Sequence, residues 1–112
     1  MTLIVSVMYV DELTGEFSGE IPLSPGAELA GLEIWRSSVY GSLKSVELGL
    51  SLLCTLKHQN ILALGSEVVT LKNETISLLN ALDNDQTYQH RLGNIISACE
   101  LAIAHGAAVW IA

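Results

Sequence analysis

The sequence predicts an α+β fold in which an N-terminal β-hairpin and a C-terminal strand share one small sheet, packed by about three helices. Three observations support this class: strand-like apolar segments at both ends, polar turns beside them, and helical periodicity in the second half. At 112 residues the chain is long enough for one core, so residues 1–112 are expected to form a single domain.

The N-terminal segment is expected to form the hairpin. Residues 2–10 are rich in Val, Ile and Tyr and alternate too little for a half-exposed strand, which predicts a central strand covered on both faces. After a polar turn at Gly15, the stretch EFSGEI alternates. Phe17, Gly19 and Ile21 should share one face, with an acidic, solvent-facing side opposite.

The middle of the chain gives weaker patterns. Residues 27–41 are expected to form a short helix followed by an extended segment carrying Trp35 and Tyr40. Between residues 42 and 57 a strand-like alternation competes with a helical stripe, and the length of the segment favours a largely buried helix.

The second half predicts two helices and a closing strand. Apolar residues recur at spacings of three and four over 66–82 and again over 86–105. Asp85 is placed to cap the second of these helices, and Gly106 is placed to end it in a left-handed conformation. The terminal AAVWIA then predicts a short strand that joins the N-terminal sheet.

Charge is distributed unevenly along the chain. Twelve acids and five bases give a formal charge of −7, which argues against nucleic acid and anionic membrane as partners. Residues 1–33 contain no Lys or Arg, and a one-signed region of this kind predicts a surface for a basic protein. The candidate partner-binding residues are its six acids, Asp11, Glu12, Glu16, Glu20, Glu28 and Glu33.

Composition also suggests that some apolar surface is hidden in an interface. Half of the residues are apolar, and the charged fraction of 15% is below the usual value of about 25%. A homodimer whose function is assembly is therefore one alternative. The N-terminal apolar run lacks the basic residues of a signal peptide, and no segment has the length of a membrane span, so the cytoplasm is expected.

No motif in the chain predicts a cofactor or a metal. The stretch DELTGEFSGE fails the EF-hand pattern because Leu13 and Gly15 occupy ligand positions. Cys54 and Cys99 lie in apolar runs without zinc-type spacing, which predicts reduced core thiols. Phosphate-binding glycine loops are absent. The remaining enzyme or ligand-binding alternative uses Cys99 with His90 or His58 in a pocket beside the last helix.

The C-terminal third resembles a known class of proteins. The stretch LGNIISACELAIAHGAAVWIA contains an A-x-E-x-A helix that runs through a glycine turn into a short aromatic strand. Over Arg91–Ala112 this is similar to the small bacterial immunity proteins that neutralise contact-dependent and other polymorphic toxins. The resemblance implies binding to a toxin domain, often a basic nuclease, so that its active site is blocked. It supplies no interface residues, which here come from charge alone.

These observations favour a non-catalytic binding protein, not an enzyme. Its acidic surface would bind and neutralise a basic protein, with a toxin as the partner that the resemblance implies. The small enzyme or ligand-binding domain and the homo-oligomeric assembly protein remain the alternatives.

Overall fold

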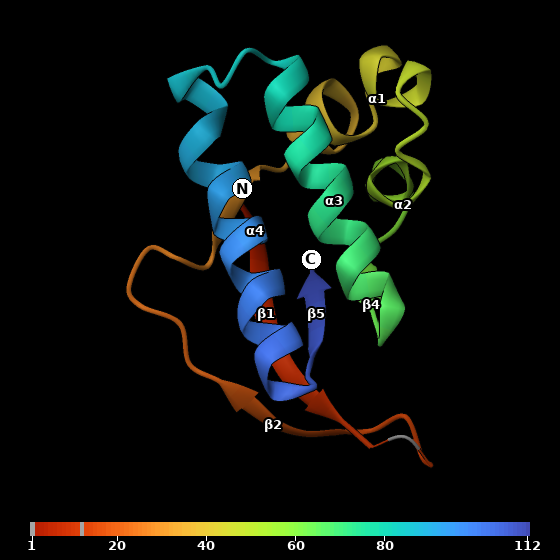
Figure 1. Cartoon of the computed structure of the whole chain (residues 1–112), viewed down its shortest axis with the longest axis vertical. Helices are drawn as coiled ribbons and strands as arrows, with labels where there is room; N and C mark the ends of the chain where they lie inside the picture. Colours follow the sequence, from red (N-terminus) through yellow and green to blue (C-terminus); the bar gives the residue numbers. More distant parts are fainter. Residues whose placement is uncertain (1, 12) are drawn as a thin grey trace.

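A computed structural model describes residues 2–11 and 13–112 and confirms the α+β class (Figure 1). Its strands, all paired antiparallel, are β1 (Thr2–Val10), β2 (Phe17–Ile21), β3 (Leu29–Leu32), β4 (Ile61–Ala63) and β5 (Ala108–Ile111). Its helices are the π-helix η1 (Arg36–Tyr40), α1 (Leu43–Glu47), α2 (Ser51–Cys54), the 3-10 helix η2 (Thr55–Lys57), α3 (Ser66–Ala81) and α4 (Gln86–His105).

The two ends of the chain meet in one sheet, as the sequence predicts. The strand order is β2-β1-β5-β4, and β3 pairs with the first half of β1. The pairing of Val5 with Ile111 and of Val7 with Val109 places the C-terminal strand directly beside the N-terminal one. The hairpin of β1 and β2 is likewise present, so β1 is central in the sheet.

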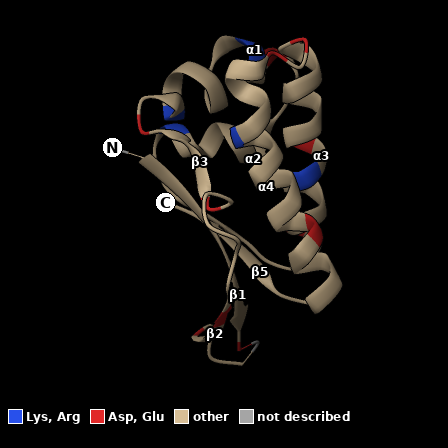
Figure 2. Ribbon diagram, turned by 90° about the vertical axis from the view of Figure 1, so that its left-hand side faces the viewer, with Lys and Arg blue, Asp and Glu red and all other residues tan. Residues whose placement is uncertain are grey.

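The long helices α3 and α4 cover one face of this sheet (Figures 1 and 2). Side chains of β1, β4 and β5 on that face are buried against the helices, among them Leu3, Val5, Val7, Ile61, Val109 and Ile111. The expectation that β1 is covered on both faces is wrong. Ile4, Ser6 and Met8 on its other face are only half-buried, because α3 and α4 both pack on the opposite face.

The last helix follows its prediction from end to end. The Asp85 carboxylate accepts a hydrogen bond from the Thr87 backbone N–H at 2.8 Å, and this bond lowers the pKa of Asp85. Gly106 ends the helix in the left-handed conformation, and the chain turns directly into β5. The Asn94 amide donates to the carbonyls of Gly26 and Leu29, which fixes α4 to the segment before β3.

Residues 27–41 have the reverse of the predicted order. A strand comes first, at Leu29–Leu32, and the helical turn follows at Arg36–Tyr40. The strand forms because Thr2–Ile4 provides a pairing partner that local sequence does not reveal. The buried Tyr40 hydroxyl donates to the Ala30 carbonyl at 2.5 Å, which joins the helical turn to the strand.

The single helix expected over residues 42–57 is broken into α1, α2 and η2. The break lies at Gly49 (φ +73°), which ends α1 in the left-handed conformation while Leu50 N–H donates to the Ser45 carbonyl. The buried Glu74 carboxylate of α3 then caps the start of α2, because it accepts hydrogen bonds from the backbone N–H groups of Leu52 at 3.3 Å and Leu53 at 2.8 Å. The short strand β4, which the sequence did not indicate, then runs to the start of α3.

Candidate functional site

The turn of the hairpin is built around Asp11. Its Oδ1 accepts hydrogen bonds from the backbone N–H of Leu13 at 2.8 Å and of Thr14 at 3.2 Å. Its own backbone N–H donates to the Glu16 carbonyl, and Gly15 N–H donates to the Asp11 carbonyl. Asp11 is therefore an exposed charge whose position is fixed by the turn it stabilises.

The second strand of the hairpin carries two further exposed acids, Glu16 just before β2 and Glu20 within it. Glu20 pairs with Met8, so it lies on the face of the sheet turned away from α3 and α4. The predicted alternation fails at Phe17, because a register shift pairs Phe17 with Val10 and moves it to that same face.

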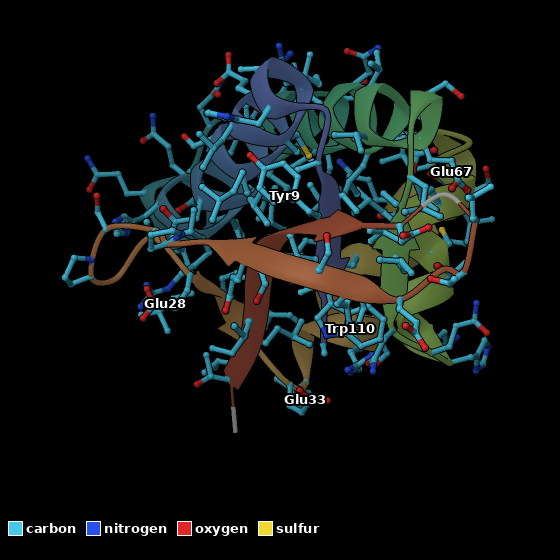
Figure 3. The ribbon with its side chains drawn as sticks, turned by 90° about the horizontal axis from the view of Figure 1, so that it is seen from below. Tyr9, Glu28, Glu33, Glu67 and Trp110 are labelled. Atoms are coloured by element: carbon cyan, nitrogen blue, oxygen red, sulfur yellow. The ribbon has the colours of Figure 1, made fainter. Side chains whose placement is uncertain are left out.

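Phe17 contacts Trp110 there in an edge-to-face arrangement, with ring centroids 6.3 Å apart. Figure 3 shows Trp110 on this side of the strands and Tyr9 on the side of the helices. The contact holds the end of the hairpin against β5, so the acids of the hairpin project from an anchored strand and not from a loose loop.

The two remaining described acids of the candidate set lie farther along the chain and differ from those of the hairpin. Glu28 is half-buried, and its backbone carbonyl accepts from Val5 N–H at 2.8 Å. Glu33 Oε1 lies 2.5 Å from Arg36 Nε in an ion pair. The charge of Glu33 is thus compensated within the chain, which weakens it as a partner contact. The sixth candidate, Glu12, lies outside the described residues.

Figure 2 separates the charges along the molecule. Lys and Arg lie in the helical half, whereas among described residues the end formed by the hairpin carries only acids. Lys72 of α3 lies 3.6 Å from Glu100 in an ion pair. The field at the hairpin end is therefore negative and is not offset locally.

A hollow of about 630 Å³ opens beside the hairpin turn. Three turns of the chain meet around it: the hairpin turn, the turn from β4 into α3, and the turn from α4 into β5. Its lining residues are Val10, Asp11, Gly15, Leu64, Gly65, Ser66, Val68, Val69, Ala102, Ile103, Gly106, Ala107 and Ala108. We refer to it as the turn groove.

Sequence reasoning missed the turn groove. Ile103 fits the apolar stripe of the last helix, yet it is 46% exposed near the C-terminal end of α4. Leu64 follows a strand that was not predicted. The one available signal was Val69, which directly follows the buried Val68 and so must lie off the buried face of α3.

The candidate catalytic side chains do not come together. Cys99 is fully buried in the core, and burial raises the pKa of its thiol to about 12, so this thiol is not ionised near neutral pH. Burial, followed by the nearby Glu74 carboxylate, also raises the pKa of Cys54. His58 and His90 are exposed. No cluster of three or more His, Cys, Asp or Glu suited to a metal occurs among residues 2–11 and 13–112.

Comparison with known proteins gives no relative: no family model, no curated protein and no solved structure matches this chain. Across the described part of the chain, every helix is too short or too polar to span a membrane.

Proposed function

We propose that this protein binds a basic protein through the acidic end formed by its hairpin and thereby neutralises that partner. The observation that carries the proposal is the exposed set Asp11, Glu16 and Glu20 on an anchored hairpin, in a third of the chain without Lys or Arg. A surface that carries acids and no bases speeds the encounter with a cationic partner and disfavours the binding of acidic proteins. Glu28 is a peripheral contact in this proposal.

The resemblance of Arg91–Ala112 to small bacterial immunity proteins supports a toxin domain as the partner and the cytoplasm as the place of binding. A basic nuclease domain has the required charge, because it must itself attract nucleic acid. In this proposal the acidic hairpin competes for that same basic surface, and so it blocks substrate without any chemistry of its own.

Genes of toxin and immunity protein are adjacent, which makes the proposal testable in cells. Each open reading frame next to this gene is expressed in bacteria with and without the protein, and growth is measured. We expect one neighbour to be toxic and the protein to restore growth. If no neighbour is toxic, or if toxicity persists in its presence, the neutralising role is wrong.

A charge variant then tests the surface itself. Replacing Asp11→Asn, Glu16→Gln and Glu20→Gln removes three charges while Asn keeps the acceptor that the turn needs. With the purified toxin we expect the Kd to rise at least about 30-fold at low salt and the salt dependence to flatten.

The matched control removes three exposed charges elsewhere, with Glu47→Gln, Asp83→Asn and Glu100→Gln. We expect this control to bind within about threefold of the native protein, since its charges lie away from the hairpin. An equal loss of affinity in both triple variants would mean that overall charge, and not the hairpin, drives binding.

A further inference from the structure

The turn groove combines a concave shape with apolar side chains that water reaches. Leu64, Val69 and Ile103 are exposed by 43%, 45% and 46% in the single chain. They come from the turn before α3, from α3 and from α4, so the fold and not a local sequence run brings them together. Scattered exposed apolar residues are ordinary, but three that line one hollow form a coherent surface for an apolar side chain.

The meeting of three turns explains why a hollow exists here, but it does not explain its lining. A polar side chain at position 64, 69 or 103 would leave the buried core unchanged, since the core side of these elements is supplied by Val68 and Ala102. Small polar residues would also be the ordinary choice at such exposed positions. The apolar lining is therefore not a requirement of folding.

Charge beside the groove indicates what kind of segment would enter it. Asp11 lines the groove. Glu67, whose Oε1 accepts from Leu64 N–H at 3.2 Å, is exposed next to the lining residues Ser66 and Val68. No Lys or Arg is among the lining residues, so cations flanking an apolar side chain would meet two carboxylates there.

We propose that the turn groove receives an apolar side chain of the basic partner, presented by a segment in which Lys or Arg flanks that side chain. The inference rests on the proposed function and deepens it. Asp11, Glu16 and Glu20 attract the partner from a distance, and the groove supplies the contact that excludes water. Most of the lifetime of the complex then comes from the groove, and most of its salt dependence from the acids.

Two synthetic peptides of equal length and charge separate the two contributions. One alternates Lys with Leu, and the other has Ser in place of every Leu. Binding is measured by titration with detection of the methyl resonances of the protein. We expect the Leu peptide to bind at least about tenfold more tightly and to shift Leu64, Val69 and Ile103 first.

Equal affinity of the two peptides would overturn the groove proposal and leave the acidic surface standing. Absence of binding by both at low salt would count against the proposed function together with the groove. Stronger binding of the Leu peptide with shifts confined to another exposed apolar region, such as Leu43 of α1, would also overturn it.

Paired substitutions in the protein test the same contact from the side of the groove. Leu64→Asp and Ile103→Asp place a charge in the groove, whereas Ile34→Asp and Leu43→Asp place one at exposed apolar positions elsewhere, at 68% and 72% exposure. All four variants gain the same acid, which by itself should favour a basic peptide. We expect the two groove variants to lose at least about tenfold in affinity for the Leu peptide and to bind the Ser peptide at least as tightly as the native protein does. Loss in the control pair alone would place the apolar contact outside the groove.

Discussion

The hairpin segment from 11 to 21 and the following segment from 27 to 41 both contain candidate acids but serve the molecule differently. In the hairpin segment every described residue through position 20 is exposed. In the second segment Ala30, Gly31 and Tyr40 are buried, and Glu33 is paired with Arg36. Both segments contain candidate acids, and only the residues around each acid show whether it belongs to the surface or to the packed part of the fold.

The difference follows from what each segment packs against. The strand β2 pairs with β1 at the edge of the sheet, and its one aromatic side chain contacts Trp110. The strand β3 also pairs with β1, but α4 packs directly on it and the turn η1 returns over it. Substitutions in the second segment should therefore lower the free energy of unfolding, whereas substitutions in the hairpin should leave it nearly unchanged.

The largest expected effect contrasts two glycines with positive φ. A Cβ at Gly31 (φ +115°) would overlap the Trp35 ring, so we expect Gly31→Ala to cost at least about 3 kcal/mol or to prevent folding. A Cβ at Gly15 (φ +73°) meets nothing within 4 Å, so Gly15→Ala should cost only about 1 kcal/mol of backbone strain. Urea denaturation of both variants measures the difference. Similar costs would mean that the two segments are equally packed.

These two segments also mark how far the sequence could predict the molecule. The hairpin, α3, α4 and β5 follow from periodicity, capping residues and turns, which are local signals. The position of β3 depends on Thr2–Ile4, more than twenty residues away, whereas the break before α2 lies at Gly49 and is local. No local pattern contains the pairing partner of β3, so this strand was placed wrongly. The glycine signal at Gly49 was available in the sequence and was missed.

The candidate surface divides in the same way. Asp11, Glu16 and Glu20 are exposed at one end of the molecule, as charge alone suggests. The pairing of Glu33 with Arg36 was open to prediction from their spacing of three residues, but the anchoring of Arg36 to later parts of the chain was not. The turn groove joins residues from three separate parts of the chain, 10–15, 64–69 and 102–108, and only a tertiary structure could reveal it.

The second prediction concerns Arg36, which fixes the second segment to the chain after α2. Its Nη1 donates to the carbonyls of Leu56 at 3.1 Å and Gln59 at 3.3 Å, and its Nη2 donates to Asn60 Oδ1 at 2.7 Å. A Lys at this position keeps the charge but cannot reach these acceptors together with Glu33. We therefore expect Arg36→Lys to lower the free energy of unfolding by about 2 kcal/mol.

The matched variant in the hairpin is Glu20→Gln, which alters an exposed acid for which no ion pair is found in the described chain. Its free energy of unfolding should stay within about 0.5 kcal/mol of the native value. Chemical denaturation at moderate salt compares the two. If Arg36→Lys is as stable as Glu20→Gln, then the interactions of Arg36 are surface contacts and the proposed framework role of Glu33 and Arg36 is wrong.

The third prediction, with a smaller effect at neutral pH than Gly31→Ala or Arg36→Lys, is Tyr40→Phe, which removes only the hydroxyl bonded to the Ala30 carbonyl. Losing this buried hydrogen bond should cost about 1 kcal/mol at pH 7. Burial also raises the pKa of Tyr40 above its ordinary value. The folded state thus holds the phenol proton more tightly than the unfolded chain does. This contribution to stability is complete below the unfolded pKa of about 10 and is lost as the pH rises above it.

The free energy of unfolding of the native protein should therefore fall relative to that of Tyr40→Phe as the pH rises from 9 to 11. The fall should reach up to about 1.4 kcal/mol per pH unit above the unfolded pKa. The buried thiol of Cys99, whose pKa is also raised, likewise lowers stability at alkaline pH. This effect is the same in both proteins and cancels in the comparison. Denaturation of both proteins at several pH values gives the difference directly. A constant difference across this range would mean that Tyr40 is open to solvent, and that the second segment is packed no better than the hairpin.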